Sequence, residues 1–248
     1  MAEFLIVAPL LLFLCLGTLQ FALLYQAKST LDVAALEAAR AGAVAHGSMA
    51  AMQSALARGL APLYARNASE EGFSQALMRS NSDIAGSSTI AVVSPSDAMV
   101  RDFAFARPSL EDGTTHSEIP NDTLMYRDSS LGPQSNVSIQ DANLLKIRVH
   151  YCYDMYVPLV NKVLYYAVNV IGSTGTGGLL TREPADGDQD PYGHPQRPDP
   201  LCRIKLGDGT TTGKWPLALE SEAMVRMQSS YRLDAASDPL QATDISSR

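Results

Sequence analysis

Few side chains in this sequence combine the residue types and the spacing that chemistry requires. Asp186, Asp188 and Asp190 repeat the alternate-carboxylate spacing with which calcium-binding loops begin. Such a loop also needs a glycine at its sixth position and a glutamate at its twelfth, where this chain has Pro191 and Arg197. We therefore interpret the stretch as a solvated acidic loop, with a weak calcium site as the alternative.

The histidines and glycine-rich stretches form no recognisable catalytic pattern. The four histidines are His46, His116, His150 and His194. They fall in different predicted elements, so surface roles fit them better than catalysis. The stretch at 172–178 lacks the Lys-Ser/Thr of a phosphate loop, and no H-E-x-x-H, C-x-x-C or G-x-S-x-G motif is present. We predict no enzymatic activity and no cofactor; a membrane-anchored enzyme or ligand-binding module using residues 172–200 is the alternative.

The three cysteines occur in two different contexts. Cys15 lies in an apolar run, whereas Cys152 and Cys202 lie in the polar part of the chain. An even pair there suits an oxidising compartment, and we expect one disulfide between Cys152 and Cys202. Two buried free thiols in a reducing compartment are the alternative.

The charge of the chain argues against nucleic acid as a partner. The formal net charge is −7, and the 19 lysines and arginines are scattered along the sequence. Phosphate binding requires a clustered basic surface. We therefore exclude nucleic-acid binding.

The element that must position any functional group is the N-terminal apolar run. Residues 4–27 contain no charged side chain, and a helix needs roughly 20 residues to cross the ~30 Å hydrocarbon core. The run exceeds the length of a secretory h-region and is not followed by an A-x-A-like cleavage site. We predict a retained transmembrane helix over 1–27. A buried core helix would need a larger apolar domain than the remaining sequence supplies.

The next segment, 28–66, is predicted to continue as an amphipathic stalk helix, which would extend on the order of 85 Å at 1.5 Å per residue if it were continuous from Phe4 to Leu60. Its apolar stripe consists of Met49, Met52, Leu56, Leu60 and Leu63. A face of small residues, open to close approach by another helix, consists of Ala34, Ala38, Ala41, Gly42 and Ala45. Gly42 and Gly47 favour bending, and Pro62 should end the helix.

Residues 67–248 are predicted to form a small α+β domain. An amphipathic helix should begin after the N-cap Ser69 and pack on the domain, with Phe73, Ala76, Leu77 and Ile84 at helical spacing. Strands are predicted at 88–95, 123–128, 145–157 and 217–229, the third of which alternates apolar and polar residues and places Cys152 on its outer face. The fold class is therefore α+β: a long transmembrane and stalk helix packed on a small antiparallel sheet, with a Gly/Pro/Asp-rich loop at 172–201.

The opening of the chain resembles that of the TadE-like pseudopilins of the bacterial Tad pilus, within the type IV pilin architecture. Those openings have a Glu-Phe pair, an apolar run with a proline six residues after the glutamate, and an Ala-Ala-Arg-x-Gly segment. The matching positions here are Glu3, Phe4, Pro9, Ala38, Ala39, Arg40 and Gly42. The later stretches SPSDAMVRDFA, IPNDTLMYR, SIQDANLLKIRVHYCYDMYVPL and AMVRMQSS are also similar to proteobacterial members of this group.

The resemblance implies a non-enzymatic minor pilin or pseudopilin that spans the inner membrane once, with its soluble domain in the periplasm. A prepilin peptidase would remove a basic leader, and the subunit would then enter or prime an adhesive pilus. Its partners would be the membrane, other pilin subunits and the assembly machinery. In that family the glutamate is fifth in the mature chain and pairs with a neighbour's N-terminal amine, whereas Glu3 is third here. A Glu3 side chain solvated at the headgroups is the alternative to pairing.

Three Asn-x-Ser/Thr sequons leave one further class open. They begin at Asn67, Asn121 and Asn136, and would suit a single-span surface glycoprotein. Such triplets are common by chance. Pilus assembly is therefore the favoured hypothesis.

Overall fold

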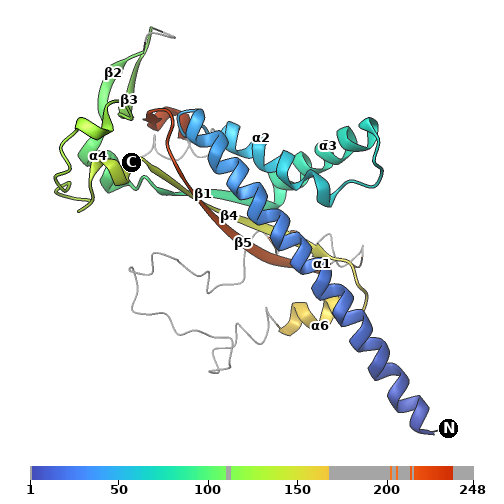
Figure 1. Cartoon of the computed structure of the whole chain (residues 1–248). Coiled ribbons are helices and arrows are strands. Elements are labelled where there is room, and N and C mark those ends of the chain that lie inside the picture. The colour runs from blue at the N-terminus through green and yellow to red at the C-terminus, as the bar shows by residue number, and fades with distance from the viewer. Residues whose placement is uncertain are drawn as a thin grey trace, which may run out of the picture. The chain divides into compact units, whose positions relative to one another are not determined.

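The protein is described by a computed structural model that covers residues 2–109, 113–167, 202, 205, 213 and 215–236. Its fold is α+β, with a long N-terminal helix and small antiparallel sheets (Figure 1). The chain divides into two compact units. The first comprises Met1–Lys28 and Tyr151–Leu219, and the second comprises Ser29–His150 and Glu220–Arg248.

The predicted long helix is present, but it is shorter than expected. Helix α1 runs from Ala2 to Val44, and helix α2 begins only at Met49 and ends at Leu60. Between them the chain turns through His46 and Gly47, whose φ angles are 58° and 80°. The helix is therefore not continuous to Leu60, and the break includes Gly47, one of the two glycines at which bending was expected. A left-handed residue ends a helix, and glycine is the residue that adopts this conformation most easily.

The turn is also tightly packed. A Cβ atom on Gly47 would lie 2.6 Å from the ring of Tyr231, so a side chain has no room there. After α2 the chain continues as the 3-10 helix η1, Ala61–Leu63, which contains Pro62. The segment 28–66 is thus a pair of helices joined by a turn.

Small residues bring α1 and α2 together within the second unit. Ala34 and Ala38 are fully buried, and a Cβ atom on Gly59 of α2 would lie 2.6 Å from the Ala34 Cα. A Cβ atom on Gly42 would lie 2.8 Å from the Met52 side chain. The predicted apolar stripe faces this contact, since Met49, Met52, Leu56 and Leu60 are buried. The small-residue face is therefore occupied by the chain's own second helix.

Helix α3, Glu70–Ser87, begins where the sequence predicts. The Ser69 side chain accepts a hydrogen bond from the Gly72 amide at 3.1 Å, which satisfies one free donor of the first turn. Ser80 is buried and donates to the Ala57 carbonyl of α2 at 2.8 Å. Ala76 and Ile84 are buried as predicted, but Phe73 is exposed. The apolar face of α3 is therefore narrower than its sequence suggests.

The first sheet contains the strands that alternate most clearly in the sequence. Its strands are β1 (Ser88–Ser94), β4 (Leu144–Met155) and β5 (Trp215–Arg226), in the order β1-β4-β5. The pairs Arg148 with Glu222 and His150 with Glu220 run in opposite directions along β4 and β5, so these two strands are antiparallel. On the other face of β4, Leu145, Ile147 and Val149 are buried.

Helix α1 packs against this sheet within the second unit. The Cβ position of Gly42 is 3.0 Å from a Leu145 methyl carbon of β4. The Ser221 hydroxyl of β5 donates to the Asp32 carboxylate of α1 at 2.6 Å. The predicted arrangement of a long helix on an antiparallel sheet is confirmed.

A second sheet has the order β2-β3-β6. Strands β2 (Phe105–Pro108) and β3 (Thr115–Ile119) are antiparallel, as are β3 and the short β6 (Tyr231–Arg232). The remaining elements are short: α4 (Asp97–Phe103), the 3-10 helix η2 (Leu124–Tyr126), α5 (Ile139–Ala142), α6 (Val160–Tyr166) and α8 (Leu233–Ala236).

The strand predicted at 123–128 was wrong. Thr123 has φ 54°, and η2 follows it. Met125 and Tyr126 are exposed, and only Leu124 of this turn is buried. Aromatic and β-branched composition indicates a strand only where a buried face selects alternate residues, and this segment has no such face.

Candidate functional site

The first part of α1 exposes large apolar side chains on every side. The exposed residues are Val7, Leu10, Leu11, Leu12, Phe13, Leu14 and Leu19. Consecutive helix positions are about 100° apart, so the five residues from Leu10 to Leu14 point in all directions around the axis. A surface of this kind is not stable in water and requires lipid or neighbouring helices around it.

By length and composition, α1 is able to cross a membrane. Among the described residues it is the one helix that meets this criterion, and little of its most apolar window is buried. Pro9 lies inside this part of α1 and is exposed. Because proline has no amide hydrogen, it removes one hydrogen bond of the helix there. Glu3 and Phe4 also belong to α1, but their side chains lie outside the described residues.

The other predicted packing residues belong to the opposite end of α1. Ala38 and Gly42 are buried within the second unit, whereas Arg40 is exposed. They are not brought together with Pro9. The opening motif thus marks two surfaces of one helix, an exposed apolar surface and a small-residue contact inside the protein.

A polar residue missed by the sequence analysis lies in the apolar run. The side chain of Gln20 is 0% exposed, and its Oε1 accepts a hydrogen bond from the Val157 amide at 3.0 Å. Within the described residues its Nε2 has no hydrogen-bond partner. Gln20 is one of two glutamines among residues 4–27. A polar side chain in an apolar run of this kind indicates a polar partner, and this signal could have been used to find the contact. Within the first unit, this hydrogen bond therefore holds the segment that follows β4 against α1.

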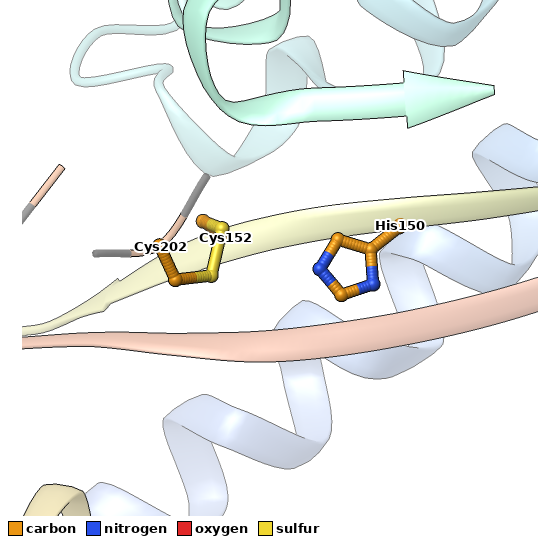
Figure 2. Close-up of side chains that lie close together, drawn as sticks. All are labelled: His150, Cys152 and Cys202. Carbon is orange, nitrogen blue, oxygen red and sulfur yellow. A yellow bond between two sulfur atoms is a disulfide. The ribbon is translucent and has the colours of Figure 1, made fainter. Parts of the chain in front are cut away.

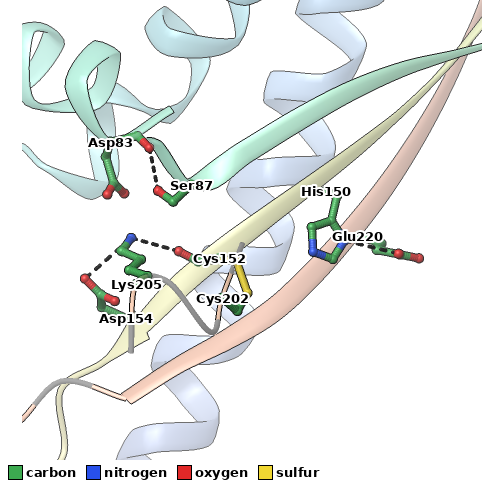
Figure 3. The surroundings of a disulfide bond; sticks show 8 residues. All are labelled: Asp83, Ser87, His150, Cys152, Asp154, Cys202, Lys205 and Glu220. Atoms are coloured by element: carbon green, nitrogen blue, oxygen red, sulfur yellow. Dashed lines mark hydrogen bonds and ion pairs between the residues drawn. A yellow bond between two sulfur atoms is a disulfide. The ribbon is translucent and has the colours of Figure 1, made fainter. Parts of the chain in front are cut away.

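The disulfide between Cys152 and Cys202 is present, with the two Cα atoms 5.4 Å apart. Figure 3 shows Lys205 beside it, where the ammonium donates to the Cys152 carbonyl at 3.0 Å and lies 3.5 Å from the Asp154 carboxylate. Cys152 is on the polar side of β4 by alternation, yet it is fully buried. Cys202 and Lys205 therefore lie against the outer side of β4, where alternation along the strand places Cys152.

The sulfurs of Cys152 and Cys202 are bonded to each other and are not thiolates, so in this state they do not offer thiolate ligands to a metal ion. Figure 2 shows the two cysteines together with His150, which precedes Cys152 by two residues on β4. The imidazole Nδ1 of His150 is 3.2 Å from the Glu220 carboxylate. The predicted weak calcium residues, Asp186, Asp188 and Asp190, lie outside the described residues.

Beside His150 is a cluster of charged side chains on β4 and β5. Glu222 lies 2.7 Å from both the Lys146 ammonium and the Arg148 guanidinium. The Lys146 hydrogen bond is the main cause of a lowered pKa of the Glu222 carboxyl; partial burial opposes it, and Arg148 adds to it. Each charge has a partner, so the cluster stabilises strand pairing and offers no reactive group.

The described histidines do not meet in one place. The Nδ1 of His46 is 2.9 Å from the Ser230 carbonyl, and the Nδ1 of His116 is 2.7 Å from the Asp234 carboxylate. His150 faces Glu220, and His194 lies outside the described residues. Each imidazole therefore has a local structural contact.

Comparison with protein families concerns the N-terminal helix. One family model, described as TadE-like protein, matches residues 1–40. The N-terminal region of this chain is TadE-like. This is consistent with a TadE-like pilin of the Tad system. Comparisons with curated proteins and with solved structures give no match.

The TadE-like region ends just before α1 does. It contains the whole exposed apolar surface, Gln20 and the first buried alanines, and it stops at Arg40. The sheets lie outside it. The likeness therefore concerns the helix that is able to cross a membrane, and the sheets must be interpreted from their own geometry.

Proposed function

We propose that the protein is a non-enzymatic minor pilin, or pseudopilin, that takes part in assembling a Tad-type adhesive pilus. One observation carries the proposal: the TadE-like helix exposes apolar side chains all around its axis between Val7 and Leu19. A pilin helix is surrounded by lipid before assembly and by other pilin helices afterwards. Both environments suit an apolar surface without a preferred side.

The proposed topology is a single span of the bacterial inner membrane with the soluble part in the periplasm. Residues 1–27 would be the span, 28–66 the helical stalk and 67–248 the soluble domain. The Cys152–Cys202 disulfide supports a periplasmic location, because such bonds persist in oxidising compartments. Since α1 ends at Val44 and α2 turns back after it, the stalk would be shorter than a continuous helix.

Glu3 is the proposed subunit-pairing residue. A carboxylate at the edge of the hydrocarbon core is costly unless it meets a cation. The free N-terminal amine of a neighbouring subunit, produced when prepilin peptidase removes a leader, would provide that cation. Phe4 and Pro9 would then belong to the surface through which the helices pack.

The test is complementation of a strain of the native bacterium that lacks this gene. We expect Glu3→Gln to reach the membrane at the wild-type level and to abolish surface pili, counted by electron microscopy and by shearing. Glu70→Gln, which removes an exposed carboxylate from the first turn of α3, is the matched control and should restore pili. Normal pili in the strain without the gene would exclude a role in assembly.

Processing is tested separately by mass spectrometry of the protein purified from its native membrane. The expected result is a mature N-terminus close to Glu3, and a longer chain in a strain without prepilin peptidase. An identical N-terminus in both strains would contradict processing by that enzyme, whatever the result with Glu3→Gln.

A further inference from the structure

Within the first unit, the segment after β4 lies beside the apolar part of α1. The bond from the Val157 amide to the buried Gln20 side chain holds the start of this segment, and α6 follows at Val160–Tyr166. Figure 1 draws α6 near α1, and Asn161 of α6 donates a hydrogen bond to the carbonyl of Met155, the last residue of β4. Gln20 therefore sets the level along α1 at which α6 lies.

This segment exposes an apolar and aromatic surface, which we call the α6 patch. Its residues are Tyr156, Leu159, Val163 and Tyr166, all exposed. Leu159 has φ 68°, a conformation that bulky residues rarely adopt, and its side chain is nevertheless exposed. A folded domain in water gains nothing by presenting such a group, so the position indicates a partner surface.

The residues around the patch have the composition of a membrane interface. Trp215 packs against Tyr165 and Tyr166, with ring centroids 5.0 Å and 5.7 Å apart. The Lys162 ammonium lies 5.7 Å from the Trp215 ring centroid. Tryptophan, tyrosine and lysine gather where hydrocarbon meets headgroups, because each has an apolar body and a polar end.

The position along α1 agrees with this composition. Glu3 and Gln20 are 17 residues apart in one helix, which corresponds to about 26 Å at 1.5 Å per residue. The hydrocarbon core is about 30 Å thick. If Glu3 lies at one boundary of the core, Gln20 and the segment bound to it lie close to the other.

We propose that the α6 patch rests on the membrane surface, with Leu159 and Val163 at the hydrocarbon boundary and Lys162 among the lipid phosphates. The occupant of the patch is thus the lipid leaflet that α1 leaves. This inference rests on the anchoring role of α1 in the proposed function. It adds a second membrane contact, which holds the first unit at the surface before the subunit is assembled.

The experiment places nitroxide labels in the full chain, reconstituted in phosphatidylethanolamine and phosphatidylglycerol vesicles. Cys15→Ser removes the one free cysteine of the sequence outside the disulfide, and single labels are introduced by Val163→Cys, Phe73→Cys or Leu12→Cys. Val163 and Phe73 are matched in exposure, at 51% and 54%. Electron paramagnetic resonance then compares collisions with oxygen, which enters lipid, and with a water-soluble nickel chelate.

The expected result is an intermediate depth for the label at 163, with several-fold less nickel contact than the label at 73. The label at 12 should be deep. If 12 is deep but 163 meets nickel as often as 73, the α6 proposal is overturned while anchoring stands. If 12 itself is aqueous, anchoring fails as well. A label at 163 that is shielded from both reagents would show that protein covers the patch, which also overturns the proposal.

A measurement without any substitution guards against misfolding of the labelled variants. Trp215 is the single tryptophan of the chain. Its fluorescence should be quenched more by lipids with a nitroxide near the headgroup than by lipids with a nitroxide at the end of the acyl chain. Equal lack of quenching by both lipids would contradict the proposal.

Discussion

The two ends of α1 share one secondary structure but have different surroundings. Leu12, near the N-terminus, is 55% exposed, whereas Leu31, nineteen residues later, is 0% exposed. Large residues dominate the exposed end. Alanines dominate the buried end, where Ala34, Ala35, Ala38 and Ala39 have no exposed surface.

The contrast shows that hydrophobicity alone does not bury a helix. The alanine-rich end is buried because its small side chains admit the backbone of α2, with Gly59 placed over Ala34. The Leu-rich end is more apolar, yet within the described part of the chain it has no helix against most of its surface. Such a surface needs lipid or neighbouring helices around it, and the proposed function supplies both.

The largest expected difference between the two ends of α1 is in the cost of truncating Leu31 or Leu12, measured as a loss of unfolding free energy. Leu31→Ala removes a fully buried side chain and should lower the free energy of unfolding of the second unit by about 2–5 kcal/mol. Leu12→Ala creates no cavity in the protein and should leave that free energy unchanged. Hydrogen–deuterium exchange of the full chain in detergent micelles measures the protection of α2 and β5 in both variants. Equal losses of protection would contradict the contrast between the two ends.

The second prediction concerns the disulfide, which lies in the first unit together with the exposed end of α1. Replacing both cysteines by Cys152→Ala and Cys202→Ala opens a link that spans 50 residues, and should cost about 2–4 kcal/mol of the stability of the first unit. Trp215 reports on this unit, so its fluorescence during urea unfolding is the measurement. Cys15→Ser, at the free cysteine on the exposed end of α1, is the control and should unfold as the wild type. A wild-type midpoint in the double variant would mean that the link contributes nothing.

Glycine-to-alanine substitutions give a smaller effect. Gly59→Ala would place a methyl group 2.6 Å from the Ala34 Cα, so α1 and α2 must separate, at a cost of about 1–3 kcal/mol despite the better helix propensity. Gly17 and Gly86 have nothing within 4 Å of the new Cβ position. Gly86→Ala should therefore be neutral or slightly stabilising, and Gly17→Ala should leave the stability of both units unchanged. Thermal unfolding followed by circular dichroism distinguishes these outcomes; a neutral Gly59→Ala would show that the close contact is not required.

Much of this architecture could be predicted from local patterns. The apolar run predicted α1, the serine at position 69 predicted the start of α3, and alternation predicted β4 and β5. These signals work because each element has one face whose environment repeats at the period of its backbone. The Cys152–Cys202 link was also predictable, since only two cysteines lie outside the apolar run.

What could not be predicted depends on contacts between distant residues. The end of α1 at Val44 is tied to Tyr231, whose ring occupies the space beside Gly47. The bond between Gln20 and Val157 joins residues that are 137 positions apart. The strand expected at 123–128 was wrong because burial, which decides between strand and turn, depends on neighbours that the local sequence does not name.

The smallest expected effect is the change in unfolding free energy at acid pH. It should affect the sheet that packs on the buried end of α1 and leave the exposed apolar end unaffected. The lowered pKa of Glu222, caused chiefly by its hydrogen bond to Lys146, means that its ion pairs stabilise the fold above its ordinary value of 4.5. That stability is lost as the pH falls through the lower, folded-state pKa. Because the group is partly solvated, the loss should be no more than about 1 kcal/mol.

Glu222→Gln should remove this acid-dependent part of the unfolding free energy and change little else. Urea unfolding of wild type and variant, at neutral pH and below the pKa of a free glutamate, measures the difference. Residues 4–27 contain no carboxylate or amine, so acid should weaken the pairing of β4 with β5 without releasing the chain from vesicles. Release from the membrane at the same pH would mean that the exposed end of α1 is held by the soluble fold rather than by its own apolar surface.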